Sequence, residues 1–388
     1  MKVVIIGAGY VGLVAAACFA EIGHDVVCVD VSAPKVDQIN KGQSPIHEPG
    51  LDELLANAIA SGRLRATTDL ADAMAGAAVT MIAVGTPFDG RNIDLTYVRE
   101  AATAIGEVLR DSAEYHVVCV KSTVVPGTTE TVVGRAVAEA SGRSIGDDIG
   151  LAMNPEFTAE GTAVSDFMNP DRIVIGANDS RAADRIRELY APFAGTDVVV
   201  TNPATAEMIK YAANSYLATV ISFSNEIANL SAAVGGVDAI DVMKGVHLDR
   251  RLAPILPHGR VRPGVLSFLL PGTGFGGSCF PKDVNALIAF GEALGSPMRV
   301  LRAVMDTNAG QPDVTVDLCR AELGGLGGKR IAVLGLAFKP GTDDVRESPA
   351  ARIIRALAEE GARVVAHDPL AIENMKAALA GVPAEYTG

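Results

Sequence analysis

The first thirty residues contain the feature that most constrains the fold. Residues 2–6 are a continuous apolar run, followed by Gly-Ala-Gly-Tyr-Val-Gly at 7–12 and by an apolar stretch over about 13–22. A second apolar run, 25–29, ends at Asp30, eighteen residues beyond the last glycine. This order predicts strand, glycine loop, helix, strand and terminal acid, which is the context of a dinucleotide-binding loop. The chain is therefore expected to begin as an α/β domain with a parallel sheet.

Asp30 narrows the choice of dinucleotide. Glycines allow the backbone to approach a pyrophosphate, and the helix that follows them presents its N-terminus to that group. A carboxylate at the end of the second strand accepts hydrogen bonds from ribose hydroxyls and repels a 2′-phosphate, so we expect NAD and not NADP. The glycine pattern alone would also suit an ordinary strand-to-helix turn.

Further apolar strands are predicted at 79–84, 117–120 and 149–153. The first two end in the small or hydroxyl residues Gly85-Thr86 and Ser122-Thr123. Ligands of open parallel sheets lie at the carboxyl ends of the strands, so these residues are candidates for the same site.

The strand at 149–153 leads into Asn-Pro-Glu-Phe-Thr-Ala-Glu at 154–160. Glu156 and Glu160 are four residues apart and share a face if a helical turn starts after Pro155. They could act as bases or hold water, or they could be helix N-terminal acids that favour the dipole. Residues 171–176 are predicted to form an edge strand that closes the first domain.

The longest helical pattern runs from about Ala204 to Val234 and is too long for a surface helix of one sheet. Glu207, Lys210, Asn214 and Asn225 lie on one narrow stripe of an otherwise apolar helix. A lysine on a helix is usually solvated, but one with an asparagine a turn further on could instead line a site.

One cysteine stands in an unusual context. The sequence Gly-Phe-Gly-Gly-Ser-Cys-Phe-Pro-Lys-Asp at 274–283 places Cys279 after a run of glycines and four residues before Asp283. A thiolate is a strong nucleophile, and glycine-rich backbone can offer amide groups to an oxyanion. A tight turn with a buried, inert thiol is the alternative. Cys18, Cys28, Cys119 and Cys319 lie in apolar patterns typical of a core.

The remainder of the chain predicts a second α/β unit. After the glycine-rich linker 324–328, apolar strands at 329–334 and 364–366 flank a helix near 349–360. We expect two Rossmann-like doubly wound domains joined by a long central helix and a helical domain, the C-terminal domain being shortened. The expected domains are 1–202, which binds NAD, 203–312, which is helical and carries Cys279, and 313–388, which is α/β.

Composition excludes several classes of function. The net charge of −13 argues against nucleic acid or an anionic membrane as a partner. Five cysteines without framework spacing and no leader-like N-terminus indicate reduced thiols in a cytoplasmic protein. Six scattered histidines show no zinc motif, so no metal is expected.

Five motifs together resemble the nucleotide-sugar dehydrogenases, nearest to the UDP-glucose branch. They are the glycine loop at 7–12, Asn-Pro-Glu-Phe at 154–157, Glu-Met-Ile-Lys-Tyr-Ala-Ala-Asn at 207–214, the cysteine motif at 274–283 and Gly-Leu-Ala-Phe-Lys-Pro at 335–340. The resemblance covers nearly the whole chain, and it implies that the helical domain 203–312 serves in dimerisation and that 313–388 bind the nucleotide sugar. It implies oxidation of a sugar primary alcohol to a carboxylate with two NAD⁺, through a thiohemiacetal and a thioester on Cys279.

The resemblance also implies roles for individual residues. Lys210 and Asn214 would stabilise the oxyanion, Asp283 and Thr123 would activate water, and Glu156 and Glu160 would place the water or act as base. The expected cofactor contacts are Gly7, Gly9, Tyr10, Val11, Gly12, Asp30, Lys35, Gly85, Thr86, Ser122, Thr123, Glu160 and Arg346. The expected substrate contacts are Glu156, Phe157, Lys210, Asn214, Arg251, Phe275, Gly276, Phe338 and Lys339, with Arg251 reaching the site of the partner subunit in a homodimer.

Two departures from the family pattern widen the range of functions to consider. The segment between Pro254 and Gly274 is longer than the family loop, so another nucleotide sugar, with a UDP, TDP or GDP nucleotide, is possible. The chain also ends before the strands that family members add. A single-step β-hydroxyacid dehydrogenase, which has no use for Cys279, and a non-catalytic NAD-binding regulator are also possible.

Overall fold

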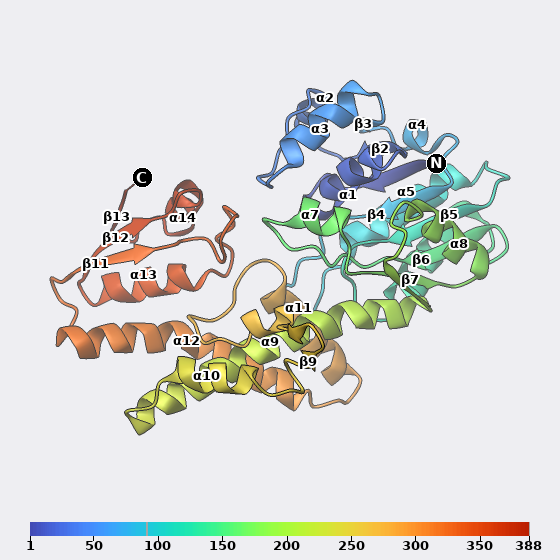
Figure 1. The fold of residues 1–388 in the computed structure, drawn as a ribbon. Helices are drawn as coiled ribbons and strands as arrows, with labels where there is room; N and C mark the ends of the chain where they lie inside the picture. Colours follow the sequence, from blue (N-terminus) through green and yellow to red (C-terminus); the bar gives the residue numbers. More distant parts are fainter. Residues whose placement is uncertain (91, 388) are drawn as a thin grey trace. The chain divides into compact units, whose positions relative to one another are not determined.

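A computed structural model of the protein describes residues 1–90 and 92–387. The chain divides into two compact units, Met1–Tyr211 and Ala212–Gly388, and the boundary falls inside the longest helix. Figure 1 shows the sheets and helices of each unit. Across the described part of the chain, every helix is too short or too polar to cross a lipid bilayer.

The first unit is built on an eight-stranded sheet with the order β3-β2-β1-β4-β5-β6-β7-β8. Neighbouring strands run parallel except β6 and β7, which pair antiparallel. The first six strands have the order of a dinucleotide-binding domain, with the topological switch between β1 and β4. The strands are β1 (Lys2–Ile6), β2 (Asp25–Val29), β3 (Leu64–Thr67), β4 (Val79–Ile82), β5 (His116–Val120), β6 (Ile149–Met153), β7 (Arg172–Ala177) and β8 (Asp197–Thr201).

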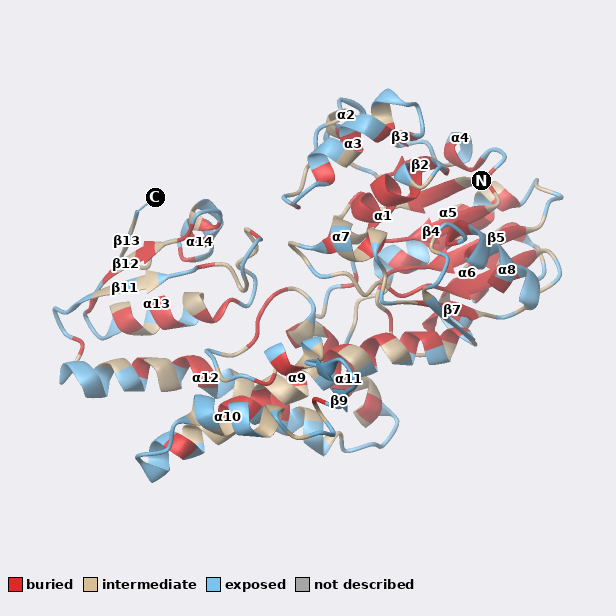
Figure 2. Ribbon diagram, in the orientation of Figure 1, coloured by how far each residue is buried: buried red, intermediate tan, exposed pale blue. Residues whose placement is uncertain are grey.

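Apolar side chains cover both faces of this sheet, and the central strands are buried (Figure 2). Strands buried on both faces have continuous apolar sequences, which is why the central strands could be predicted. One face packs against α1, α3, α7 and α8, and the other against α5, η1 and α6. The helices are α1 (Tyr10–Glu21), α2 (Ala33–Asn40), α3 (Leu51–Ala60), α4 (Leu70–Met74), α5 (Thr96–Leu109), η1 (Thr129–Gly134), α6 (Arg135–Ser141), α7 (Ala163–Met168), α8 (Ser180–Leu189) and α9 (Pro203–Val234).

The predicted edge strand is not at the edge. β7 pairs on its outer side with β8, whose residues Val198–Val200 are exposed. β8 was not predicted, although the five-residue run Asp197–Thr201 has the composition of a strand. The long central helix is present as predicted, since α9 has 32 residues.

The second unit contains the rest of α9, a helical region and a small parallel sheet with the order β11-β12-β13. An antiparallel hairpin, β9 with β10, and a short 3₁₀ helix lie in the segment between Pro254 and Gly274. The elements are α10 (Ala239–His247), β9 (Ile255–Leu256), β10 (Gly259–Arg260), η2 (Gly264–Ser267), α11 (Phe280–Ala293), α12 (Arg299–Leu323), β11 (Arg330–Leu334), α13 (Pro349–Glu359), β12 (Arg363–His367), α14 (Ile372–Ala378) and β13 (Ala384–Tyr386).

Three features of this unit go beyond what the sequence indicated. α11 begins at Phe280, so Cys279 is its N-cap residue. α12 runs from Arg299 to Leu323 through Pro312. The second sheet has a third strand, β13, that was not predicted.

The same backbone device recurs at the start of each parallel sheet. Ala8 N–H donates to Asp30 Oδ2 over 2.8 Å, and Leu336 N–H donates to Asp368 Oδ2 over 2.7 Å. In both cases an acid at the end of the second strand holds the loop that follows the first strand. Asp368 accepts further bonds from the N–H groups of Leu370 and Ala371. Burial acts to raise the pKa of Asp368, but these backbone N–H groups hold it below its usual value.

Candidate active site

The glycine loop after β1 has the shape of a dinucleotide cradle. Gly7 has φ +105°, and a Cβ there would lie 2.6 Å from the carbonyl oxygen of Ala83. A Cβ on Gly12 would lie 1.8 Å from Gly7 O, so only glycine lets α1 pack this closely on the loop. Gly9, the N-cap of α1, has open space where its Cβ would be. Two glycines thus close the turn and the third leaves backbone free for a ligand, which fits NAD.

The other predicted cofactor residues of the first unit surround this loop or the neighbouring strand ends. Besides the Ala8 amide, Asp30 accepts from Ser32 N–H over 2.9 Å, and its carboxylate stays half-exposed. Lys35 is exposed on α2, five residues further along the chain. Tyr10 OH accepts from Gly161 N–H over 3.1 Å, which ties α1 to the turn after Glu160.

The carboxyl ends of β4 and β5 are joined by hydroxyl groups. Thr86 Oγ1 donates to Thr123 O over 2.8 Å, and Ser122 Oγ donates to Val84 O over 2.6 Å. The predicted positions Gly85-Thr86 and Ser122-Thr123 therefore lie side by side. This edge of the sheet is where the strand order reverses, and so where ligands bind in such folds.

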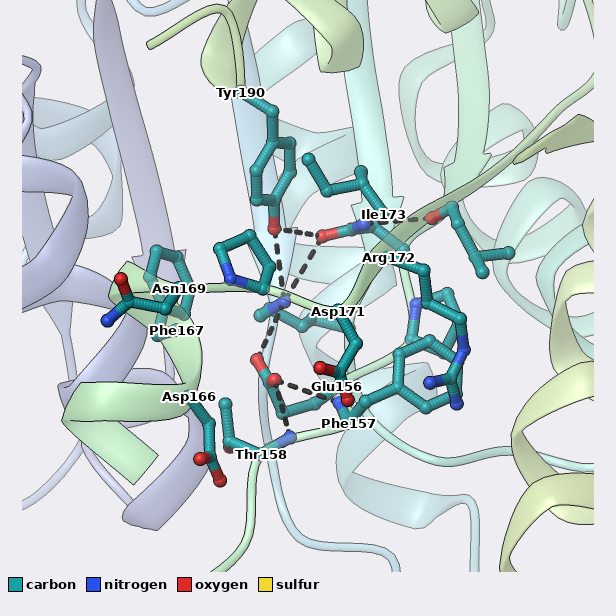
Figure 3. Close-up of a pocket in the computed structure, with 15 residues that line it drawn as sticks. Glu156, Phe157, Thr158, Asp166, Phe167, Asn169, Asp171, Arg172, Ile173 and Tyr190 are labelled. Carbon is teal, nitrogen blue, oxygen red and sulfur yellow. Dashed lines mark hydrogen bonds and ion pairs between the residues drawn. The ribbon is translucent and has the colours of Figure 1, made fainter. Parts of the chain in front are cut away.

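A buried lysine that was not among the predicted site residues lies at the next strand end, in a pocket whose lining includes Glu156 and Tyr190 (Figure 3). Lys121 Nζ lies 2.9 Å from Glu156 Oε2 and 3.1 Å from Asn154 Oδ1. The hydroxyl of Tyr190 lies 3.4 Å from the same nitrogen. These groups line a cavity of about 150 Å³. The sequence did carry a signal for Lys121, because this lysine directly follows the apolar strand β5.

Glu156 is fixed from both sides. Its Oε1 accepts from the N–H groups of Phe157 and Thr158 over 2.9 and 3.0 Å, while Oε2 faces Lys121. Burial acts to raise the pKa of this carboxyl, but the Lys121 ammonium and the backbone N–H group of Thr158 hold it below its usual value. A carboxylate held ionised in this way is a weak proton acceptor. Residues 154–159 are not helical, so Glu156 and Glu160 do not share a helix face as expected.

Lys210 lies on the ring of Phe157. Its Nζ is 5.6 Å from the ring centroid, and the guanidinium of Arg172 lies 3.9 Å from the same ring. Lys210 is only 7% exposed, which is unusual for a lysine. The aromatic ring thus holds two cations through cation–π contacts.

Glu207, one turn before Lys210, anchors α9 to the loop after β5. Its carboxylate accepts from the N–H groups of Gly127 and Thr129 over 2.5 and 2.8 Å, and from Thr129 Oγ1 over 2.6 Å. Burial raises the pKa of Glu207 to about 7. The polar stripe predicted on α9 is therefore buried and bonded in its first turn.

In the second unit, Cys279 is exposed at the first turn of α11. Asp283 N–H donates to Cys279 O over 2.8 Å. The Asp283 carboxylate is 1% exposed and accepts from Asn214 Nδ2 over 2.6 Å and from Lys282 Nζ over 2.6 Å. Hydrogen bonds therefore link three predicted residues. The Cys279 backbone bonds to the Asp283 backbone, and the Asp283 carboxylate bonds to the Asn214 side chain.

The remaining thiols differ from Cys279. Cys18, Cys28 and Cys119 are buried, and burial raises the pKa of each to about 12. Cys319 is half-buried against the core of the small sheet. Cys279 is the one exposed thiol of the five, all of which the structure describes.

The two glycines before Cys279 are required by close contacts. A Cβ on Gly276 would lie 2.1 Å from Glu347 O, and one on Gly277 would lie 2.7 Å from the ring of Phe338. Gly277 N–H donates to Arg346 O over 2.8 Å. Of the residues predicted after β11, Phe338 and Arg346 therefore lie at the cysteine turn, and Lys339 Nζ lies 5.8 Å from the centroid of the Phe338 ring. Phe275 packs edge-on against Phe280.

Arg251 lies in the turn after α10 and is exposed. It pairs with Asp249 over 2.5 Å, and its hydrogen bonds lower the pKa of that carboxyl to about 2. Arg260 of the hairpin donates to Leu248 O and Ala253 O, at either end of this turn. Arg260, in the long segment 255–273, therefore stabilises the turn that carries Arg251.

Comparisons with known proteins agree with this site. Residues 1–194 match the NAD-binding domain of the UDP-glucose/GDP-mannose dehydrogenase family, 204–310 match its central domain and 332–386 match its UDP-binding domain. The NAD-binding match and the glycine cradle confirm NAD as the cofactor. The fold predicted from the sequence, with its two α/β parts and long central helix, is confirmed as well.

Individual relatives are similar along almost the whole chain. UDP-glucose 6-dehydrogenase AglM of Haloferax volcanii is 50% identical over 97% of this chain and 85% of its own length. UDP-glucose 6-dehydrogenase TuaD of Bacillus subtilis is 45% identical over 99% of this chain and 79% of its own. A UDP-glucose dehydrogenase structure from Pyrobaculum islandicum has a TM-score of 0.91 and 45% identity, covering 100% of this chain and 86% of that one. This chain belongs to the UDP-glucose/GDP-mannose dehydrogenase family.

Proposed function

We propose that this chain oxidises the C6 primary alcohol of UDP-glucose to the carboxylate of UDP-glucuronate, as an NAD-dependent nucleotide-sugar 6-dehydrogenase. The observation that carries the proposal is the exposed Cys279 at the start of α11, with Asp283 buried in the first turn of that helix and bonded to Asn214 of α9. A dehydrogenase that stops at the aldehyde has no need of such a thiol. The substrate is inferred from the UDP-glucose dehydrogenases that this chain resembles.

The chemistry balances with one thiol and one water. NAD⁺, when bound, accepts a hydride in each of two oxidations. After the first oxidation, Cys279 Sγ bonds to the aldehyde carbon and the carbonyl oxygen takes up a proton, which gives a thiohemiacetal. The second oxidation removes the carbon-bound hydride and the hydroxyl proton, leaving a thioester on Cys279. Water then attacks the acyl carbon, the C–S bond breaks, and the thiol and the carboxylate are released.

Two side chains on α9 stabilise the oxyanion that develops at this carbon. Lys210 and Asn214 are four residues apart and face the same side of the helix. Both are 7% exposed, so each acts in a site from which most water is excluded. Loss of one such donor typically lowers kcat by ~10²–10³.

The water and the proton are handled by acids. Asp283 and Thr123 hold the attacking water, and Glu160 accepts its proton. We give Glu156 a different role, because Lys121 and two N–H groups already occupy its carboxylate. Glu156 keeps Phe157 in place against Lys210.

We further propose that the chain acts as a homodimer in which Arg251 reaches the substrate of the partner subunit. Tyr216, Phe223 and Leu230 are each about half exposed on α9 and are spaced seven residues apart. This spacing puts them on one stripe, the pattern of a helix that packs against another helix. In the dimer, Phe157, Phe275, Gly276, Phe338 and Lys339 supply the remaining substrate contacts.

We assign NAD binding to residues 1–202, dimerisation to 203–312 and nucleotide binding to 313–388. The family matches over 1–194, 204–310 and 332–386 support this division. We infer a reducing compartment such as the cytoplasm, because the exposed Cys279 must remain reduced to act.

The experiment is to count NADH per sugar across a panel of UDP-, TDP- and GDP-sugars with purified enzyme. The proposal expects two NADH per UDP-glucose and conversion to the acid. A value of one would indicate a single-step dehydrogenase. The absence of turnover on every sugar would indicate a non-catalytic NAD-binding protein. Preference for another nucleotide sugar with two NADH would keep the chemistry and correct the substrate.

A further inference from the structure

The backbone just before the cysteine turn is held by carboxamide side chains from two helices. Gly272 N–H donates to Asn225 Oδ1 of α9 over 2.7 Å. Gly272 O accepts from Gln311 Nε2 of α12 over 3.0 Å. Asn229 Nδ2 in turn donates to Gln311 Oε1 over 3.1 Å, which fixes the orientation of that amide.

A second pair of bonds holds the segment three residues further on. Asn308 Oδ1 accepts from Phe275 N–H over 2.7 Å, and Asn308 Nδ2 donates to Phe275 O over 3.0 Å. One side chain therefore pairs with both backbone groups of one residue, as a neighbouring strand would. We call Asn225, Asn308 and Gln311 the carboxamide clamp.

The clamp is a built feature and not incidental surface bonding. Asn225 is fully buried and Gln311 is 5% exposed. Burying a carboxamide is unfavourable unless it is hydrogen-bonded. The backbone of Gly272 supplies the bonds of Asn225 Oδ1 and Gln311 Nε2, while Asn225 Nδ2 has no partner among the described residues. Gly274 has φ +99°, and a Cβ there would lie 2.8 Å from Asn308 Oδ1. The segment is thus shaped for the approach of Asn308.

The position of Cys279 follows from what lies on either side of it. Phe275 is fixed by Asn308 and packs in one apolar cluster with Val284 and Ile288 of α11 and Val304 of α12. Cys279 lies between this fixed residue and the first turn of α11. If the Phe275 backbone were no longer held by Asn308, the Cys279 thiol would therefore be displaced.

Resting on the function proposed above, we propose that Asn308, Gln311 and Asn225 are positioning residues that set Cys279 for capture of the aldehyde. Capture requires the sulfur to meet the aldehyde carbon within a narrow range of distance and angle. A displacement of about 1 Å can cost ~10² in rate. The first oxidation forms no bond to the thiol, so the clamp affects the capture step selectively.

The test compares Asn308→Ala with Ser222→Ala. Ser222 is 2% exposed, and its Oγ donates to Val304 O, so this control removes a buried α9–α12 bond that does not touch residues 272–275. Two quantities are measured. One is hydrogen exchange of the peptide that covers residues 272–278. The other is NADH formed per UDP-glucose consumed, with hydroxylamine present to trap free aldehyde.

We expect Asn308→Ala to speed exchange at residues 272–278 by at least tenfold and to lower NADH per sugar from two toward one, as aldehyde escapes to the trap. Ser222→Ala should leave both values as in the wild type. The ratio does not depend on the fraction of folded enzyme, so a purely structural role for Asn308 would not change it. Asn308→Asp keeps the acceptor for Phe275 N–H but not the donor, and should give an intermediate ratio.

If Asn308→Ala does not fold, Gln311→Ala and Asn308→Asp take its place with the same expectations. Faster exchange with a ratio that stays at two would overturn the positioning role. Unchanged exchange would show that the clamp does not hold the segment. A wild-type enzyme that yields no acid would instead refute the proposed function, and the exchange measurement would still judge the clamp.

Discussion

Replacing Lys121 by methionine removes the cation from the most buried ion pair of the first unit. Lys121 is 2% exposed and the Glu156 side chain 13%. Methionine fills a similar volume, so little of the effect comes from a cavity. What remains is an uncompensated carboxylate, and removing one partner of a buried pair costs about 3–5 kcal/mol.

The expected change in melting temperature is large. For a unit of this size, each kcal/mol lowers Tm by ~2–4 °C. Lys121→Met should therefore lower the Tm of the N-terminal unit by roughly 6–20 °C at neutral pH. Differential scanning calorimetry of the purified variant measures this directly.

The pH dependence gives the sharper test. In the wild type, Lys121 and the Thr158 N–H hold the pKa of Glu156 below its usual value. The stability that they add is therefore fully present above the ordinary carboxyl pKa of ~4.3, and it is lost as the pH falls through the depressed pKa of Glu156. Without the cation, burial raises the pKa of Glu156, and the variant gains stability as pH falls. The Tm difference between variant and wild type should thus shrink between pH 7.5 and pH 5.

A double variant separates charge from packing. In Lys121→Met/Glu156→Gln the buried charge is gone, while the amide oxygen still accepts from the N–H groups of Phe157 and Thr158. Most of the lost Tm should return, and the pH dependence should disappear. A drop of less than about 2 °C in Lys121→Met, or a drop that does not vary with pH, would refute the reasoning.

Three further experiments test separate parts of the site. Asp30→Ala should raise KM for NAD about tenfold and reduce the preference over NADP, because it removes the acceptor for ribose hydroxyls and for Ala8 N–H. An unchanged ratio of kcat/KM for the two cofactors would contradict that role. Glu207→Gln should flatten the Tm–pH curve between pH 5 and 7, because burial raises the pKa of Glu207 to about 7 and the wild type loses this stability as pH rises from ~4.3 to that value. Curves that stay parallel would speak against it. Arg251→Ala and Cys279→Ser should each form no acid alone, but mixing them should restore acid production through mixed dimers if Arg251 acts across the interface. No recovery would place Arg251 in the site of its own chain.

The sequence predicted the parts of the molecule that local pattern encodes. The glycine loop, Asp30 and the buried strands follow from spacing and apolar runs, and the stripe on α9 follows from helical periodicity. The edge strand β8 was missed because short strands carry little signal. This omission left the predicted architecture intact.

Long-range partners could not be predicted from the sequence. The pairing of Lys121 with Glu156 spans thirty-five residues, and that of Asn308 with Phe275 spans thirty-three. Only hints were present: a lysine at the end of a buried strand, and an asparagine and a glutamine three apart on one helix. The roles of Lys121, Asn308 and Gln311 can be assigned only once the fold is known, because the fold brings their partners next to them.

Product analysis of Cys279→Ser tests the central claim most directly. The variant is incubated with UDP-glucose and NAD⁺, and acid and aldehyde are measured by mass spectrometry, with Cys319→Ser as the matched control. If Cys279 carries the acyl group, Cys279→Ser should form aldehyde or hemiacetal but no UDP-glucuronate above background, while Cys319→Ser makes acid at the wild-type rate. Normal acid production by Cys279→Ser would contradict the role of this thiol as acyl carrier.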